Sequence, residues 1–189
     1  MLIYCATTNP GKLAEFQLAA PPDLSIVPAG RFDCPETGRT FEENAIQKAL
    51  CYARHVQGLT LADDSGLEIE ELGGEPGVHS ARYAGPGASD EQNRALLVEK
   101  LRALRGRPRG RFVCVIALAW PERLQATFRG IAEGEILDAP RGSGGFGYDP
   151  LFYFPPLGRT FAELTAEEKL AHSHRGKAFR TMVEWLKAK

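Results

Sequence analysis

The sequence predicts an α/β fold, with a mixed β-sheet flanked by helices, in a single domain over residues 1–189. Strand-like and helix-like segments alternate along the chain, three candidate helices begin with a capping-box signature, and residues 111–120 form an apolar segment suited to a central strand. Hydrophobic residues make up 43% of the 189 residues, which is sufficient for a substantial buried core.

The N-terminal part is expected to begin with a strand at residues 1–7, which an Asn-Pro-Gly sequence ends. Helical spacing then extends over residues 12–20, and two prolines stop it. Thr40, followed by Glu43, is a capping-box signature for a second helix, which ends near Gly58. One strand and two helices are therefore expected in this part.

The middle of the chain contains most of the strand candidates. Short strands are expected at residues 59–63 and 67–70, and a helix that opens at Ser89 follows them. Residues 111–120 are the best candidate for a central strand, and residues 124–135 can return antiparallel to it across a Pro-Glu-Arg turn. This pair, among alternating helices, makes the predicted sheet a mixed one.

The C-terminal part is expected to add one strand and further helix. The short strand LFYF occupies residues 151–154, after a glycine-rich loop. Thr165 with Glu168 is another capping box, and the chain ends in a helix. The apolar positions of that last helix are Phe179, Met182, Val183 and Leu186.

The overall charge and the cysteines limit the function classes. A net charge of −1 gives no bulk attraction to nucleic acid or to an anionic membrane, so neither is expected as a partner. The first apolar stretch is too short for a signal peptide and no segment is long enough to span a membrane, so we expect a soluble cytoplasmic protein. The cysteines lack CxxC spacing, which favours reduced structural thiols over a disulfide framework or a zinc site. They are Cys5, Cys34, Cys51 and Cys114.

The segment ATTNPGK, residues 6–12, joins the first strand to the first helix. Free backbone N–H groups and the helix dipole favour an anion at such a junction, and Lys12 adds a positive charge. These features favour a phosphate site. The alternative is an ordinary Asn-Pro-Gly turn with a solvated lysine.

Two adjacent carboxylates, Asp63 and Asp64, follow an apolar segment, and their mutual repulsion requires compensation. Hard oxygen ligands suit Mg²⁺, which takes one or two protein carboxylates and completes its shell with water and substrate phosphates. Glu36, in the loop before the second helix, is a candidate for a second ligand. The alternative is a turn in which Ser65 and Gly66 supply the bend.

The glycine-rich loop GSGGFGYD matches the dinucleotide-binding pattern GxGxxG, but a strand rather than a helix follows it, which excludes that interpretation. Phe146 or Tyr148 in this loop can stack on a planar base, and Asp149 can accept a hydrogen bond; the alternative is a turn whose aromatic side chains fill the core. A basic cluster near the last helix can bind phosphate oxygens or a base carbonyl, or it forms a solvated face. Its members are Lys169, His172, His174, Arg175, Lys177 and Arg180.

Together these segments describe a magnesium-bound nucleoside triphosphate as the ligand. The sequence also resembles the inosine triphosphate pyrophosphatase family, also called dITP/XTP diphosphatases or HAM1-like proteins. The resemblance is carried by ATTNPGK, ETGRTFEENAIQKA, LADDSGLEIEELGGEPGVHSARYAG, GGFGYDPLF and ELTAEEKLAHSHRG, in this order. It implies an elongated fold with the nucleotide in a cleft between two lobes, a homodimer, and Mg²⁺-dependent hydrolysis of ITP, dITP and XTP to the monophosphate and pyrophosphate.

The resemblance also implies roles for individual residues. Glu36 and Asp64 match the metal ligands, and Asp64 matches the general base, with Asp63 in support. Family members commonly have glycine where this chain has Thr8. The residues that match the substrate site are Thr7, Thr8, Asn9, Pro10, Gly11, Lys12, Lys48, Ser65, Phe146, Gly147, Tyr148, Asp149, Lys169, His174 and Arg175.

Phosphoanhydride chemistry then suggests the mechanism. We expect Asp64 to activate a water for attack on the α-phosphorus, while lysines offset the charge of the phosphates. The lysines are Lys12, Lys48 and Lys169. Three other functions stay open on the sequence: a pyrophosphatase for modified pyrimidine or methylated nucleotides, a nucleotide sensor without turnover, and a phosphohydrolase that releases orthophosphate.

Overall fold

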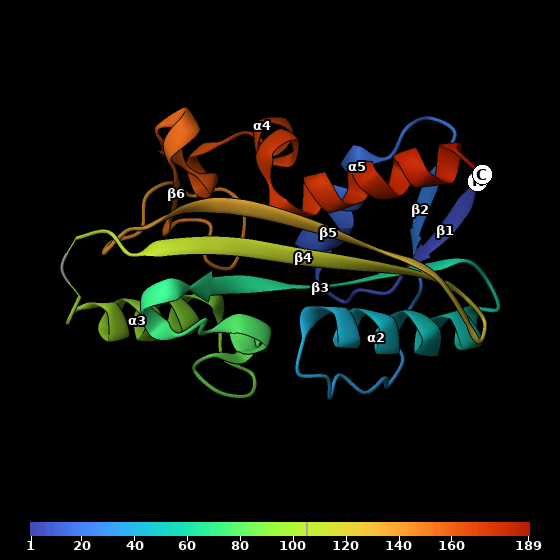
Figure 1. The fold of residues 1–189 in the computed structure, drawn as a ribbon, viewed down its shortest axis with the longest axis horizontal. Helices are drawn as coiled ribbons and strands as arrows, with labels where there is room; N and C mark the ends of the chain where they lie inside the picture. The colour runs from blue at the N-terminus through green and yellow to red at the C-terminus, as the bar shows by residue number, and fades with distance from the viewer. Residues whose placement is uncertain (105) are drawn as a thin grey trace. The chain divides into compact units, whose positions relative to one another are not determined.

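The computed structural model describes residues 1–104 and 106–189, and within them the chain forms five α-helices and a seven-stranded mixed sheet (Figure 1). The strands are hydrogen-bonded in the order β2-β1-β3-β4-β5-β6-β7. Their bounds are β1 (Leu2–Cys5), β2 (Ser25–Pro28), β3 (Thr60–Ile69), β4 (Arg109–Trp120), β5 (Arg123–Ile136), β6 (Phe152–Phe154) and β7 (Arg159–Thr160). The helices are α1 (Pro10–Ala19), α2 (Phe41–Val56), α3 (Asp90–Leu101), α4 (Ala166–His172) and α5 (His174–Lys187). The predicted α/β class is confirmed.

The chain divides into two compact units, and each has its own hydrophobic core. In the core of unit 1, Phe16 of α1 packs against Phe179 of α5, with ring centroids 5.5 Å apart. In the core of unit 2, the Phe152 ring lies 4.7 Å from that of Phe161. Unit 1 comprises Met1–Ser65, Cys114–Ile131 and Leu170–Lys189, and unit 2 comprises Gly66–Val113 and Ala132–Lys169.

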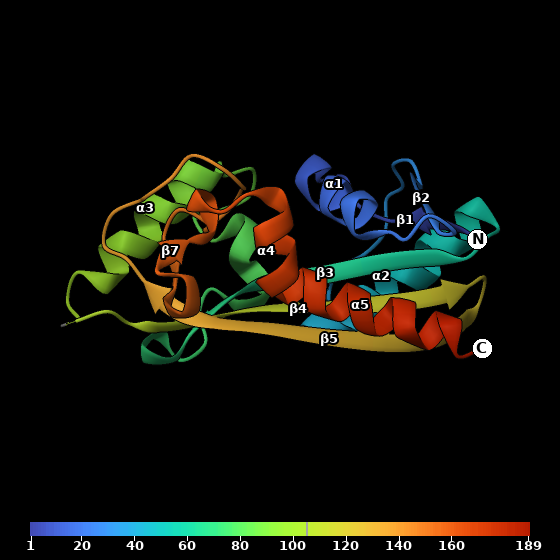
Figure 2. The ribbon, with the colours of Figure 1, turned by 90° about the horizontal axis from the view of Figure 1, so that it is seen from above.

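The first three strands of unit 1 form a βαβαβ arrangement. β1 lies between β2 and β3 and is parallel to both. α1 connects β1 to β2 and α2 connects β2 to β3, and the two helices cover opposite faces of the sheet (Figures 1 and 2). The strand order therefore reverses at β1, and α/β proteins bind ligands at the carboxyl ends of the strands beside such a reversal. The sequence did not predict the four-residue strand β2.

The predicted helix starts are largely confirmed. α1 begins at Pro10, two residues before the predicted start, because Asn9 is its N-cap. Thr40 caps α2 by accepting a hydrogen bond from the backbone N–H of Glu43. The Glu43 carboxylate accepts from the N–H of Arg39 instead of from that of Thr40, so only half of this capping box forms. Both halves form at the starts of α3 and α4.

The structure corrects the prediction of two short strands at residues 59–63 and 67–70, because β3 is one strand of 10 residues. The turn that was the alternative at Ser65 and Gly66 is therefore wrong as well. The backbone stays extended through Asp63 and Asp64 because the two side chains point to opposite faces of the strand, and each carboxylate has polar partners on its own face. The acidic pair thus lies inside a strand rather than at its end.

The structure also corrects the prediction of four reduced thiols. Cys34, in the segment before α2, forms a disulfide with Cys51 of α2, while Cys5 and Cys114 are free and buried. Spacing along the sequence did not indicate this pair, because the connection of β2 to α2 has no regular pattern that places Cys34. Burial raises the pKa of the Cys5 thiol to about 12, which keeps it protonated and inert.

Reduction of the disulfide is expected to lower the free energy of unfolding by about 3 kcal/mol, because it frees a loop with a sequence separation of 17 in the unfolded chain. Urea unfolding with and without a dithiol reductant, both with a metal chelator, measures this difference. A Cys34→Ser, Cys51→Ser double variant should match the reduced protein and be insensitive to reductant. Equal stability of the oxidised and reduced forms would contradict this expectation.

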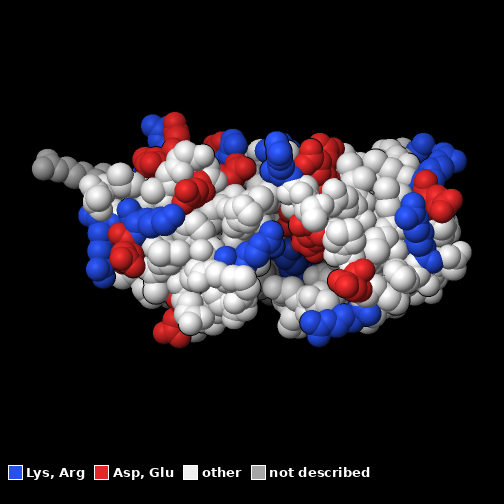
Figure 3. All heavy atoms as spheres, turned by 90° about the horizontal axis from the view of Figure 1, so that it is seen from below, with Lys and Arg blue, Asp and Glu red and all other residues white. Residues whose placement is uncertain are grey.

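Among the described residues, no helix is long and apolar enough to cross a membrane. Figure 3 shows Lys and Arg side chains intermixed with Asp and Glu over one face of the molecule.

Candidate functional site

The predicted phosphate segment follows directly after β1, whose last two residues pair with the first two residues of β3. Asn9 Oδ1 accepts hydrogen bonds from the backbone N–H groups of Gly11 (2.9 Å) and Lys12 (3.1 Å). Thr7 Oγ1 accepts a bond from the N–H of Asn9 at 3.2 Å. These bonds fix residues 7–12 as a turn that opens directly into α1.

Lys12 turns from this segment toward the acidic pair. Its side chain is only 16% exposed, and its Nζ lies 2.9 Å from Asp63 Oδ2. The alternative interpretation of a solvated lysine is therefore wrong. The contact places a cation of the β1–α1 junction directly on β3.

The acidic pair is divided between the two faces of the sheet, because consecutive side chains of a strand point in opposite directions. Asp63 contacts Lys12 of α1 and Arg175 of α5. Asp64 accepts a hydrogen bond from Asn44 of α2, on the opposite face. The two carboxylates consequently have different chemical environments.

Asp63 is fully buried and bound by cations. Its Oδ2 lies 2.9 Å from Lys12 Nζ and 3.4 Å from Arg175 Nε, and it accepts a bond from Ser65 Oγ at 3.1 Å. Burial alone raises the pKa of Asp63, but the neighbouring cations, Lys12 first, hold that pKa well below its usual range. Its Oδ1 has no hydrogen-bond partner within the described part of the chain. Asp63 is therefore an ionised anion throughout the neutral range.

Arg175 is buried in the same network. Its NH1 lies 2.5 Å from Glu15 Oε2, and its NH2 donates to Ser65 Oγ at 2.8 Å. The first turn of α5, where His174 is also buried, comes this close to the sheet because Gly130 of β5 has no side chain. The guanidinium of Arg175 therefore joins α1, β3 and α5 within unit 1.

Asp64 is oriented rather than neutralised. Its Oδ2 accepts from Asn44 Nδ2 at 2.9 Å, and its Oδ1 accepts from the backbone N–H of Ser65 at 3.0 Å. Burial raises the pKa of Asp64, although the Asn44 bond and the charges of Lys12 and Lys48 act against it. A fixed carboxylate with a raised pKa is suited to accept a proton.

The segment that carries Glu36 is connected to Asp64 through α2. The N–H of Gly38 donates to Asn44 Oδ1 at 2.7 Å, while the Nδ2 of the same amide donates to Asp64. A Cβ at Gly38 would lie 2.8 Å from this Oδ1, so the close approach requires glycine. Glu36 Oε1 lies 3.0 Å from Lys48 Nζ, and Lys48 also interacts electrostatically with Asp64. Lys48 thus forms an ion pair with Glu36 and interacts electrostatically with Asp63 and, less strongly, with Asp64.

This donor set fits a magnesium ion. Glu36 and Asp64 supply hard carboxylate oxygens, and the Glu36 side chain is 36% exposed, which leaves access for water and phosphate oxygens. Burial lowers the pKa of Lys48, and the surrounding carboxylates more than reverse this effect. The cluster therefore already stabilises one positive charge.

In unit 2, the residues predicted to bind the base surround a buried ion pair. Lys169 Nζ lies 2.5 Å from Asp149 Oδ2, and Asp149 also accepts from the backbone N–H of Phe146 at 2.9 Å. The same Nζ lies 4.5 Å from the centroid of the Phe146 ring. Lys169 is 5% exposed, so the alternative of a solvated basic face is wrong for this residue.

Tyr148 and Gly147 are held by other parts of unit 2. The Tyr148 ring is buried, its hydroxyl donates to Ser80 O at 2.9 Å, and burial raises its pKa. Tyr148 therefore fills the core, as the alternative interpretation of this loop expected. The N–H of Gly147 donates to Asp90 Oδ2 at 2.7 Å, and Gly147 O accepts from Arg94 at 2.6 Å. α3 consequently fixes the tip of the loop.

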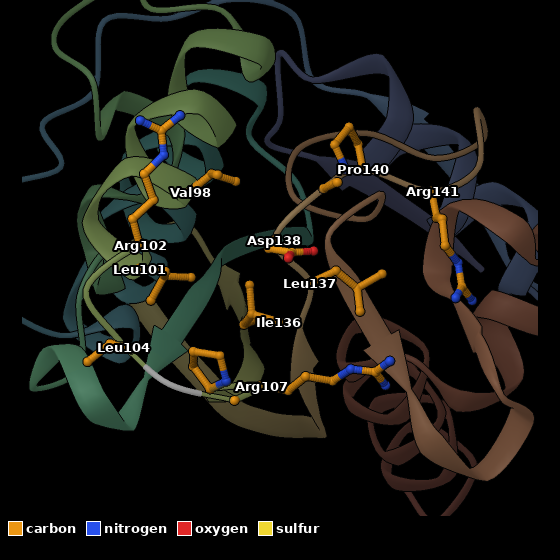
Figure 4. Close-up of a pocket in the computed structure, with 13 residues that line it drawn as sticks. Val98, Leu101, Arg102, Leu104, Arg107, Ile136, Leu137, Asp138, Pro140 and Arg141 are labelled. Carbon is orange, nitrogen blue, oxygen red and sulfur yellow. The ribbon is translucent and has the colours of Figure 1, made fainter.

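Figure 4 shows a pocket of about 760 Å³ in unit 2, lined by the end of α3 and two loop segments. Two arginines on its wall already have partners: Arg107 lies 3.4 Å from Glu135, and Arg141 lies 2.9 Å from Glu163. None of the predicted site residues, all of which the structure describes, lines it. It is therefore no candidate for the triphosphate.

Two residues of the unit 1 site were not predicted, Asn44 and Glu15. The sequence did contain a signal for Asn44. This residue stands one turn before Lys48 on the apolar face of α2, where a buried amide requires a hydrogen-bond partner. The sequence has no comparable signal for Glu15, whose partner Arg175 is 160 residues away.

The chain is similar to known proteins over nearly its whole length. The sequence profile described as the Ham1 family matches residues 3–185. A dITP/XTP pyrophosphatase of Thermus thermophilus is 49% identical over 189 residues, an alignment that covers 97% of this chain and 91% of the relative. A dITP/XTP pyrophosphatase of Staphylococcus aureus is 44% identical, with 97% and 95% covered. A solved HAM1 protein from Coxiella burnetii superposes with a TM-score of 0.90 at 42% identity and covers 100% of both chains.

Proposed function

The chain belongs to the Ham1 family, and we propose that it hydrolyses ITP, dITP and XTP to the nucleoside monophosphate and pyrophosphate. The names of its relatives specify dITP and XTP. The observation that carries the proposal is the unequal pair in β3: Asp63 is bound by two cations, whereas Asp64 is oriented and has a raised pKa. These environments suit Asp63 to the role of a structural anion and Asp64 to that of a general base.

We propose that the cofactor is Mg²⁺ and that Glu36 and Asp64 would hold it. Bound there, it would supply Lewis acidity toward phosphate oxygens. Lys12 and Lys48 now pair with Asp63 and Glu36, and they offer ammonium groups to an incoming triphosphate. The N-terminal turn of α1, residues 10–12, adds backbone dipoles of the same sign.

Asp64 is the proposed general base of the reaction. It orients a water and removes its proton as the oxygen attacks the α-phosphorus in line, and the bond to the departing pyrophosphate breaks. Asp63 is unsuited to this role, because its depressed pKa and its two cationic partners make it a poor proton acceptor. Asn44 and the N–H of Ser65 fix the carboxylate plane of Asp64 for this transfer.

For the purine base we propose the loop at residues 146–149 together with Lys169. Hypoxanthine and xanthine present a 6-oxo acceptor and an N1–H donor, and adenine reverses both. A site that pairs with the oxo base leaves buried polar groups unpaired against ATP, which discriminates by about 10⁴-fold. Because Arg175 is buried with Glu15 and Asp63, we propose that it positions Asp63 rather than the base.

Product analysis tests this function. Purified protein with Mg²⁺ is incubated with ITP, dITP or XTP, with ATP and GTP as controls, and pyrophosphate and orthophosphate are quantified separately. We expect pyrophosphate and the monophosphate from the deaminated nucleotides only. Orthophosphate as the product would favour a general phosphohydrolase, and binding without turnover would favour a nucleotide sensor. Parallel incubations with dUTP and dTTP test the pyrimidine alternative, and faster hydrolysis of either would reassign the substrate.

The homodimer is also a proposal, which rests on the family resemblance. Light scattering across a range of protein concentrations distinguishes a dimer from a monomer, and a monomer at all concentrations would contradict it.

Replacing Asn44 with Ala is expected to lower kcat/KM by roughly 10- to 100-fold, since a hydrogen bond to a charged group contributes about 1.5–3 kcal/mol. The acidic limb of the pH profile should move to higher pH. The Asn44 bond lowers the pKa of Asp64, so without it burial raises that pKa further and less base is ionised at a given acidic pH. Initial rates across the acidic range measure both effects.

Gln47→Ala is the matched control for this variant. Gln47 Oε1 accepts from the N–H of Thr37 at 3.2 Å, so it binds the same segment as Asn44 but does not touch Asp64. The acidic limb of the pH profile of Gln47→Ala should coincide with that of the wild type. A coincident limb for Asn44→Ala as well would refute the coupling between Asn44 and the base.

A further inference from the structure

Cys34, Cys51 and His55 form a second cluster of ligand atoms in unit 1, and the proposed activity uses none of them. Two sulfurs and one imidazole nitrogen all lie within 4.8 Å of one another. Cys34 and Cys51 are half-buried and His55 is exposed, so solvent reaches the cluster. An ion from solvent can therefore reach the cluster, whose two sulfurs are joined as a disulfide in this structure.

The backbone already brings these donors together. Cys51 and His55 stand four residues apart in α2, so they lie one turn apart on the same face. The imidazole ring of His55 stacks on Phe32, with centroids 4.3 Å apart and an interplanar angle of 6°. Phe32 precedes Cys34 by two residues, so one short segment supplies both a ligand and the support for another. The Cα atoms of the two cysteines are 6.0 Å apart.

We propose that Cys34, Cys51 and His55 of the reduced protein bind one thiophilic divalent cation such as Zn²⁺. Thiolate sulfur and imidazole nitrogen are the ligands that zinc prefers, and a water completes the four-coordinate shell. Two thiolates balance the charge of the ion. Mg²⁺ prefers oxygen ligands, so this site and the carboxylate site select different metals.

Reduction of the disulfide precedes metal binding. A dithiol reductant supplies two electrons and two protons: the S–S bond breaks, both cysteines become thiols, and the reductant leaves as its own disulfide. Binding of the ion then releases both thiol protons to solvent. The disulfide and the metal exclude each other, because both use the sulfurs of Cys34 and Cys51.

Titration of the whole chain with Co²⁺ tests the proposal, because Co²⁺ bound to thiolates gives a sulfur-to-metal charge-transfer absorption. Protein that is reduced and then freed of reductant without air is expected to bind one equivalent with this absorption, and Zn²⁺ should displace it. The oxidised protein should show no such absorption. Its absence from the reduced protein, or equal binding by the oxidised protein, would overturn the proposal. No nucleotide is involved, so the result is independent of the proposed activity.

Variants locate the site. Cys51→Ser should abolish the absorption. His55→Ala should weaken the affinity for Co²⁺ by more than about tenfold, because the loss of a residue that only supports a metal ligand already costs that much. His79→Ala is the matched control, an exposed histidine of unit 2 that should leave the titration unchanged. Circular dichroism of the metal-free variants verifies that they fold. An absorption that persists in Cys51→Ser, or unchanged affinity in His55→Ala, would overturn the assignment.

Discussion

An Asp64→Asn variant is expected to lose about two to four orders of magnitude in kcat while it remains folded, because an amide cannot accept the proton of the attacking water. The amide oxygen of the new side chain can still accept from Asn44 Nδ2, so the packing against α2 is preserved. Pyrophosphate release at saturating dITP and Mg²⁺ measures kcat, and thermal unfolding verifies the fold.

Glu68→Gln is the control for that variant. Glu68 is also a carboxylate of β3, but it pairs with the half-exposed Arg111 at 2.6 Å and belongs to unit 2. Its kcat should equal that of the wild type. A kcat for Asp64→Asn within about tenfold of the wild type would remove Asp64 from the role of base.

Arg175→Met is expected to lower the free energy of unfolding by about 3–5 kcal/mol, because it removes the buried cation that Asp63 and Glu15 share and leaves only Lys12 beside the buried Asp63. For a chain of this length the melting temperature should fall by roughly 6–20 °C. Urea unfolding and calorimetry measure the two quantities.

Arg111→Met provides the comparison, since it removes an arginine whose side chain is 49% exposed in its ion pair with Glu68 and should cost less than about 1 kcal/mol. Adding Glu15→Gln to Arg175→Met should restore part of the loss, because one of the two negative charges that Arg175 offset is then removed. Equal effects of Arg175→Met and Arg111→Met would show that the buried network contributes little.

The sequence predicted the parts of the fold that depend on local patterns. Helix starts at Ser89 and Thr165 follow from short-range hydrogen bonds that the residue types make almost obligatory. The strand β2 and the continuity of β3 depend instead on pairing and on charge compensation from distant residues. A local pattern contains neither, so Asp-Asp-Ser-Gly predicts a break where the structure has a continuous strand.

For the candidate site, the sequence indicated the residues involved, but it said less about how they are arranged in space. Lys12, Glu36 and Lys48 were expected near the acidic pair. Lys12 forms an ion pair with Asp63, and Lys48 forms a separate one with Glu36. The family resemblance implied different roles for Asp63 and Asp64, but their different environments could not be predicted from local patterns, because these follow from the strand that contains both residues. Nor could the burial of Arg175, which depends on a close approach of α5 to β5 at a glycine.

The alternation of side chains along β3 places a parity constraint on the length of this strand. Inserting or deleting one residue between Thr60 and Asp63 would turn every later side chain over, so that the carboxylate now beside Asn44 would face the arginine instead. Only changes by an even number of residues preserve the assignment. The segment before α2 is irregular and has no such parity, so length variation in homologous chains should accumulate there and be excluded from the first residues of β3.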